Sequence, residues 1–406
     1  MRIKFFENFI SLSIIKGFQL LVPLVTLPYL ILTLGLSNYG KIAFAQSISI
    51  FLGAVIQYGF NLTATRKVSR QKNDWTKLAE TFSLTFGAGF FLSLASASIL
   101  VPILMVFIKD TILFWTCIFS FLTIAFQSLL PIWLFNGMEK LKFIAFVGAV
   151  SNICFLIGIL TFVTEIGHTV RVPMIQSITS FAALAFTLLI INYSLKIPVN
   201  FSTITLNSIM GSLKENRSTF IVQFVPNLYN NASIFLLGVM GGTLDVGIFS
   251  AAKRIADACC SLAQIISSTF ISELSNNMKY FSTYKNIVLN VGVGVAVIIW
   301  ILSDILGLFF SSRDSESVSL ILKSLTPAVL FYFAMLCYGQ TYLIISNNEV
   351  IYQNITLVVS ICALPVACGL IYFYGAVGAV CTITAARFVI SFTSYISYRR
   401  LNVPIT

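Results

Sequence analysis

Residues 143–164 read FIAFVGAVSNICFLIGILTFVT, an apolar run without a single charged side chain. A helix needs about 20 mostly apolar residues to cross the hydrocarbon core of a bilayer. Within that core, only helices and closed barrels satisfy every backbone hydrogen bond. The stretch therefore predicts a transmembrane helix.

The same pattern recurs along the chain of 406 residues, of which 58% are hydrophobic and only 10% are charged. Soluble domains contain roughly 25% charged residues, so this composition excludes an ordinary soluble protein. Hydropathy and turn signals together predict twelve spans, near residues 8–33, 41–64, 80–108, 112–135, 143–164, 173–195, 218–240, 246–271, 286–310, 318–345, 352–374 and 376–397. We expect an all-α polytopic membrane protein with little chain left for a soluble domain.

Positive charges are unevenly distributed over the predicted loops. If the N-terminus is cytoplasmic, sixteen of the 25 lysines and arginines lie in inside segments and only four in outside loops. Because cytoplasmic loops carry an excess of lysine and arginine, this asymmetry predicts that both termini are cytoplasmic. The lysines and arginines of the inside segments also account for most of the net charge of +11. The positive charge therefore gives no reason to expect a nucleic-acid partner.

The two halves of the chain resemble each other. Residues 39–48, YGKIAFAQSI, are matched 207 residues later by residues 246–255, VGIFSAAKRI, with Gly, Ala and Ile in register. Six predicted spans separate the copies, so the copies have the same orientation, as in transporters built from two parallel bundles. We therefore expect two pseudo-symmetric six-helix lobes, residues 1–200 and 201–406.

Polar side chains follow one face of several predicted spans. In the span 246–271 they recur at steps of three and four, as Ser250, Lys253, Asp257, Ser261, Gln264 and Ser268. Fainter stripes in the first and second spans include Lys16, Gln19, Gln46, Gln57 and Asn61. Because polar groups are costly in hydrocarbon, these faces predict a hydrated cleft between the halves. The alternative is that the amides bond across a packed helix interface without a cavity.

Ionisable residues inside predicted spans are the strongest functional signal. They are Lys16, Lys253, Arg254, Asp257, Asp304, Lys323 and Arg387. Lys253 and Asp257 are four residues apart and can pair on one helix face. Asp304 and Lys323 lie near span ends, where they can pair with each other or reach the interface.

Three of these cations, Lys16, Arg254 and Arg387, have no acidic partner that is evident in the sequence. A cation at the centre of a bilayer costs at least about 2.5–3.5 kcal/mol. We therefore interpret these side chains as contacts for an anionic cargo.

The sequence gives little support for catalysis. Its single histidine, His168, lies in a short predicted loop, and no phosphate-binding glycine loop, zinc pattern or nucleophile elbow occurs. The eight cysteines lie in predicted spans without metal-ligand spacing and are expected to be small buried thiols. We expect no enzymatic activity, no metal and no cofactor.

Three segments carry a family resemblance: residues 23–30 (PLVTLPYL), 57–66 (QYGFNLTATR) and 131–139 (PIWLFNGME). They are similar to segments of the O-antigen flippases, the Wzx-type polysaccharide biosynthesis membrane proteins, and the similarity is densest over residues 8–145. The resemblance implies the fold of the multidrug, oligosaccharidyl-lipid and polysaccharide exporter superfamily, with two six-helix lobes around a central cavity.

The resemblance also implies a substrate and a location. The substrate would be an undecaprenyl-pyrophosphate-linked oligosaccharide, turned from the cytoplasmic to the periplasmic leaflet of the bacterial inner membrane. The expected partners are this glycolipid, membrane lipids, and the polymerase and chain-length proteins of the same pathway.

The polar stripes then suggest roles for single residues. Lys16 would receive the pyrophosphate, Arg254 and Arg387 would hold it midway, and Asp257 is a candidate for coupling to protons or sodium. The full set of candidate substrate-binding residues is Lys16, Gln19, Gln46, Gln57, Asn61, Lys253, Arg254, Asp257, Gln264 and Arg387. Three alternatives stay open: an exporter of drugs or another lipid-linked head group, a membrane transferase, and a structural membrane subunit.

Overall fold

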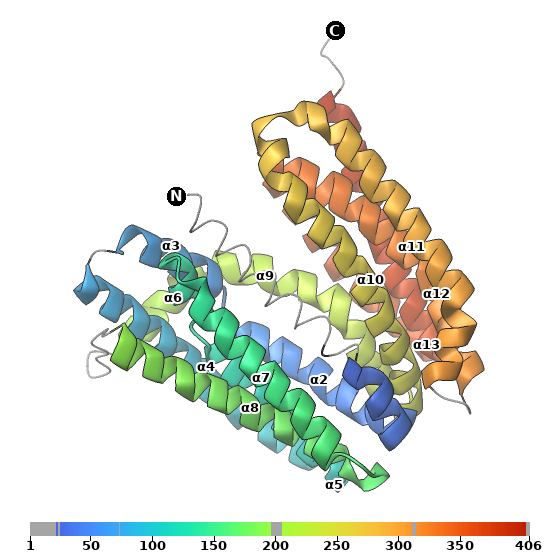
Figure 1. Ribbon diagram of the computed structural model, residues 1–406, viewed down its shortest axis with the longest axis horizontal. Helices are drawn as coiled ribbons and strands as arrows, with labels where there is room; N and C mark the ends of the chain where they lie inside the picture. The colour runs from blue at the N-terminus through green and yellow to red at the C-terminus, as the bar shows by residue number, and fades with distance from the viewer. Residues whose placement is uncertain (1–21, 23–24, 73, 196–204, 311–313, 403–406) are drawn as a thin grey trace. The chain divides into compact units, whose positions relative to one another are not determined.

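The computed structural model describes residues 22, 25–72, 74–195, 205–310 and 314–402, and all regular elements in these ranges are helices (Figure 1). After the helix Val25–Leu34, they are in chain order α2 (Leu36–Gln57), α3 (Phe60–Arg70), α4 (Trp75–Phe107), α5 (Thr111–Leu129), α6 (Ile132–Gly137), α7 (Leu141–Phe162), η1 (Ile166–Val170), α8 (Arg171–Leu189), η2 (Ile190–Ser194), α9 (Leu206–Met240), α10 (Thr243–Asn276), η4 (Met278–Tyr280), α11 (Phe281–Phe310), α12 (Ser315–Ala334), η5 (Met335–Leu343) and α13 (Glu349–Asn402). The candidates Lys16 and Gln19 lie outside the described ranges, so their roles stay predictions.

These helices coincide with the predicted spans from the second onward. Eight helical segments of the described chain are long and apolar enough to cross a membrane. α9 and α10, 35 and 34 residues long, are not among them, and α10 carries five charged side chains, three of them at positions 253, 254 and 257. Of the first predicted span, the described part includes the apolar helix Val25–Leu34. The chain is an all-α polytopic membrane protein, as predicted.

The last two predicted spans share α13, which changes direction at Gly375. This glycine has φ 54° and ψ −129°, a conformation that residues with a side chain rarely adopt. A Cβ added at Gly339 of η5 would touch both Tyr352 and Ser394, which lie on opposite sides of that turn. The chain therefore doubles back at Gly375, and both halves of α13 pack on η5.

The chain divides into two compact units. The first comprises Met1–Leu34 and Ala45–Phe224, and the second comprises Gly35–Phe44 and Val225–Thr406. The predicted lobes, residues 1–200 and 201–406, stay a prediction; in this division the first part of the continuous helix α9 packs with the first unit. The N-terminal end of α2 likewise packs with the second unit.

The core of the first unit explains one segment that carries the family resemblance. In the stretch 131–139, Trp133, Leu134 and Phe135 are buried against α3, α4 and α7. Gly137 lies so close to Val68 of α3 that a Cβ on it would overlap the valine side chain. This segment therefore stabilises the fold.

The internal repeat has a structural counterpart in the second unit. Gly40 of α2 and Gly247 of α10 lie where the two helices cross. A Cβ on Gly40 would overlap the carbonyl oxygen of Thr243, and a Cβ on Gly247 would overlap that of Leu36. Both pairs of equivalent positions, 40 with 247 and 36 with 243, are related by the offset of 207 residues, so the crossing is symmetric under the repeat. The Oγ of Ser37 lies 2.8 Å from Oγ1 of Thr243 and adds a hydrogen bond.

The start of α5 depends on one exposed carboxylate. Asp110 accepts hydrogen bonds from the backbone N–H groups of Ile112 at 2.9 Å and Leu113 at 3.3 Å. We expect Asp110→Ala to lower the free energy of unfolding by about 1 kcal/mol, because two N-terminal donors of the helix lose their acceptor. Chemical denaturation of the purified protein measures this loss. The control Asp110→Asn keeps an acceptor, and an alanine variant as stable as this control would contradict the prediction.

Candidate functional site

The predicted polar stripe of α10 is present and becomes more accessible along the helix. Ser250 is buried, Lys253 and Asp257 are partly buried, and Gln264 and Ser268 are exposed. A helix face that exposes amides and hydroxyls is unsuited to lipid, because an unpaired polar group is costly in hydrocarbon. We therefore expect the accessible end of this stripe to border a hydrated space.

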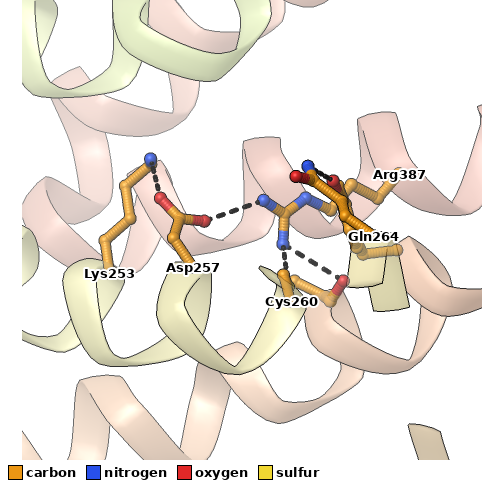
Figure 2. A network of polar contacts seen from close by, with 7 residues as sticks. Lys253, Asp257, Cys260, Gln264 and Arg387 are labelled. Carbon is orange, nitrogen blue, oxygen red and sulfur yellow. Dashed lines mark hydrogen bonds and ion pairs between the residues drawn. The ribbon is translucent and has the colours of Figure 1, made fainter. Parts of the chain in front are cut away.

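The centre of the stripe is a cluster in which one carboxylate contacts two cations (Figure 2). Oδ2 of Asp257 lies 2.5 Å from Nζ of Lys253, which confirms the predicted pair within α10. Oδ1 of the same carboxylate accepts a hydrogen bond of 3.1 Å from Nη2 of Arg387, in the second half of α13. Arg387, for which no acidic partner is evident in the sequence, therefore has one in the structure. Its partner lies 130 positions away on another helix, which helical spacing in the sequence does not reveal.

Further contacts hold the guanidinium of Arg387 in place. Its Nη1 donates to the carbonyl oxygen of Ala328 at 3.3 Å and contacts Sγ of Cys260 at 3.7 Å. The guanidinium carbon lies 5.0 Å from the ring centroid of Tyr332, a cation–π distance. Nε2 of Gln264 in turn donates to the Tyr332 hydroxyl at 2.6 Å. Arg387 therefore joins α10, α12 and α13.

The three charged groups differ in exposure. The side chain of Asp257 is 39% exposed, whereas those of Lys253 and Arg387 are 11% and 4% exposed. The carboxylate is thus the accessible member of the cluster, and both cations are shielded. With all three groups ionised, the cluster carries an excess of one positive charge.

Arg254, the neighbouring candidate, is partly buried. Its charge acts on the buried hydroxyl of Tyr39. These residues all belong to the second unit. Arg254 therefore adds positive charge beside the repeat crossing of α2 and α10, whereas Lys253 and Arg387 share Asp257.

The candidates of α2 and α3 lie in the first unit. Nδ2 of Asn61 donates to Oε1 of Gln57 at 3.2 Å, and both side chains line a small pocket together with Thr85 and Ser128. The pocket measures about 20 Å³, enough for roughly one water molecule. A sugar does not fit there in this conformation. Gln46 is half-buried in α2 and makes contacts of its own.

The remaining charged pair is a peripheral ion pair. Nζ of Lys323 lies 2.8 Å from both carboxylate oxygens of Asp304, which also accepts a hydrogen bond from Ser319. The ammonium group lies 5.9 Å from the ring centroid of Trp300. The structure therefore shows Asp304 and Lys323 paired with each other, which is one of the two interpretations that the sequence allowed.

Cysteines and acidic residues form no metal site in the described ranges, where no three His, Cys, Asp or Glu residues gather. The expectation of buried thiols is wrong for Cys154, Cys362 and Cys381, which are exposed. The outer face of a membrane helix is as apolar as its packed face, so apolar neighbours in the sequence do not indicate burial.

Comparison with known proteins places the chain in a family. The family described as "Polysaccharide biosynthesis protein" matches residues 5–271. A protein of Escherichia coli strain K12 that carries the provisional name O-antigen transporter is 24% identical over 397 residues, 94% of this chain and 93% of its own length. A protein of Shigella dysenteriae with the same provisional name is 24% identical over 387 residues, 93% of this chain and 96% of its own.

Solved structures identify the fold. The lipid II flippase MurJ in an inward closed conformation matches with a TM-score of 0.77 at 18% identity, over 95% of this chain and 87% of its own. A point mutant of the Vibrio cholerae MATE transporter VcmN matches with a TM-score of 0.64 at 13% identity, over 98% and 96% of the two chains. The chain therefore has the fold of these transporters, and the comparisons agree with the expectation that it is not an enzyme.

Proposed function

Because this chain belongs to the polysaccharide biosynthesis protein family, we propose that it is a flippase for lipid-linked polysaccharide precursors. The proposed cargo is an oligosaccharide repeat unit on undecaprenyl pyrophosphate, moved from the cytoplasmic to the periplasmic leaflet of the inner membrane. The provisional names of the curated relatives and the MurJ-like fold support a role as a flippase for lipid-linked polysaccharide. Alternating access is the proposed mechanism.

One observation carries the proposal: an ion cluster with an excess positive charge lies where α10 meets α12 and α13, beside an accessible polar stripe. Lys253, Asp257 and Arg387 form the cluster, and their charges do not cancel. Cations inside a membrane protein usually pair or serve a substrate path. A pyrophosphate linkage supplies the anion that the excess charge attracts, whereas a neutral cargo would not.

Electrostatics suits outward movement of this cargo. With the cell interior negative, each negative charge that moves outward gains about 2.3 kcal/mol per 100 mV, or about 4.6 kcal/mol for two charges. The obstacle is therefore the barrier, because neither a dianion nor a set of sugar hydroxyls enters hydrocarbon bare. A flippase lowers that barrier by supplying cations and hydrogen-bonding groups along the path.

Within this proposal, the residues of the second unit take the central roles. Lys253 and Arg387 attract the phosphates, and Arg254 adds charge nearby. Gln264 lies on the accessible part of the stripe and can bond sugar hydroxyls. Lys16, Gln19, Gln46, Gln57 and Asn61 stay predicted contacts, and for Gln57 and Asn61 the pocket would have to widen.

Deletion of the gene in its host tests the function. We expect the deletion strain to lose surface polysaccharide and to regain it with the wild-type gene on a plasmid, while its tolerance of cationic drugs stays unchanged. Immunoblotting of the polymer and growth in a drug series measure the two outcomes. Normal polymer with altered drug tolerance would contradict the proposal and favour a drug exporter of the same superfamily.

Labelling of single cysteines tests the proposed orientation. In a variant without native cysteines, Glu165→Cys should react with a membrane-impermeant thiol reagent in intact spheroplasts, because its loop is predicted to be periplasmic. Lys142→Cys, exposed near the start of α7, should react only after lysis. The reverse pattern would overturn the cytoplasmic placement of the termini.

A further inference from the structure

Asp257 has a position that a structural ion pair does not require. It lies between Lys253 and Arg387 and gives one carboxylate oxygen to each (Figure 2). It is also more exposed than either cation. An anion that approaches the cluster from the accessible side therefore reaches the carboxylate before it reaches the charges that would bind it.

The two cations already have the geometry of an anion site. Two oxygens of one anionic group contact an ammonium and a guanidinium group, an arrangement that a phosphate can reproduce with its own oxygens. Arg387 is held independently by the Ala328 carbonyl and the Tyr332 ring. Its guanidinium therefore stays in place when the carboxylate moves away, so the site is preorganised.

We propose that Asp257 is an internal counter-ion, which the phosphate end of the cargo displaces from Lys253 and Arg387. This inference rests on the proposed function, since it specifies how the flippase accepts a phosphate. While the site is empty, the carboxylate neutralises part of the buried positive charge. When a phosphate arrives, it takes over the two cations and the carboxylate turns toward the hydrated space.

Displacement also sets the selectivity of the site. A ligand must compete with a carboxylate that is always present at close range, so neutral head groups and weakly charged anions are rejected. A pyrophosphate competes well because it offers more negative charge and more acceptor oxygens than the carboxylate. Removing the carboxylate should therefore strengthen the binding of the anion, although it also removes a contact between α10 and α13.

The opposing interpretation is a purely structural link between α10 and α13. In that case, loss of the carboxylate destabilises the protein, and no added anion has a special effect on the variant. The two interpretations thus differ in the response of an Asp257 variant to a soluble anion, and inorganic pyrophosphate is a suitable probe.

Thermal unfolding of the purified full chain in detergent, titrated with inorganic pyrophosphate at constant ionic strength, tests the inference. We expect Asp257→Asn to be stabilised at a pyrophosphate concentration at least tenfold lower than the wild type requires. The control Asp257→Asn/Arg387→Gln lacks the cation that the Ala328 carbonyl and the Tyr332 ring hold in place, and it should lose this gain. Equal responses of Asp257→Asn and the wild type, or equal responses of Asp257→Asn and the control, would overturn the inference.

A charge-matched variant keeps the test decisive if Asp257→Asn does not fold. Asp257→Asn/Lys253→Gln has the same net charge as the wild-type cluster but leaves Arg387 without the competing carboxylate. It should also bind pyrophosphate more tightly than the wild type, and weaker or equal binding would contradict the inference. Because these measurements use no lipid-linked sugar, they are independent of the gene deletion. Normal surface polysaccharide after deletion would refute the flippase while leaving a displaceable anion site intact.

Discussion

Arg387→Gln is expected to abolish export, so that surface polysaccharide falls by about tenfold or more. A tenfold loss corresponds to an increase of about 1.4 kcal/mol in the barrier of the rate-limiting step. The substitution removes the most buried cation of the cluster and its contacts with Asp257, Ala328 and Tyr332. The remaining pair of Lys253 and Asp257 has no excess charge to attract a phosphate. Polymer on the cell surface, normalised to the amount of protein in the membrane, measures the effect.

Controls separate lost transport from lost folding in this experiment. Removing one partner of a buried ion pair lowers the free energy of unfolding by about 3–5 kcal/mol. The loss is smaller here, because Asp257 is partly exposed and solvent screens its charge. The Arg387→Gln variant keeps the ion pair of Lys253 and Asp257, so it should accumulate better than the double variant Asp257→Asn/Arg387→Gln, in which Lys253 loses its carboxylate, and neither variant should export. Arg399→Gln, an exposed position near the end of the same helix, should behave as wild type. A wild-type amount of surface polymer in cells with normal levels of the Arg387→Gln protein would show that this cation is not needed for export.

Gly40→Val should prevent correct assembly of the second unit. The new side chain would overlap the carbonyl oxygen of Thr243 and the backbone nitrogen of Gly247. These backbone atoms cannot rotate away as the end of a flexible side chain can. Overpacking typically lowers the free energy of unfolding by about 1–3 kcal/mol. Because the overlap here is with backbone atoms, we expect a loss at or above the upper end of that range. The amount of monodisperse protein after extraction and its melting temperature report the loss.

A matched glycine provides the control for that substitution. Gly148 lies inside α7, and a Cβ added there would have no other atom within 4 Å. Gly148→Ala should fold normally and gain up to about 1 kcal/mol from its helix propensity. At the crossing, Gly40→Ala already introduces the overlapping atom. If Gly40→Ala melted at the same temperature as Gly148→Ala, the close packing of α2 and α10 would be refuted.

The sequence predicted the helices well because each helix that crosses a membrane must be long and apolar by itself. The stripe on α10 was also visible, since helical spacing places Lys253, Asp257 and Gln264 on one face. Its pairing with α13 was not visible. Arg387 meets Asp257 through tertiary packing, and spacing rules describe contacts within one helix only.

Other parts of the site show the same limit. The sequence identified the polar face of Gln57 and Asn61, but only the structure shows that this face lines a small pocket in the first unit. Tyr332 was missed because a lone tyrosine in an apolar span resembles any other aromatic residue. It becomes significant once Gln264 and Arg387 are seen to contact it. The repeat was recognisable, whereas the symmetric contact of its glycines required coordinates.

The most direct test of the account is flipping by the purified protein in vesicles. Undecaprenyl-pyrophosphate-linked oligosaccharide is placed in both leaflets, and an enzyme added outside modifies only the sugar heads that it can reach. Wild-type protein should make the inner pool reachable much faster than in protein-free vesicles, and Arg387→Gln should match the protein-free rate. A wild-type rate equal to that of protein-free vesicles, or full activity of Arg387→Gln, would contradict the account.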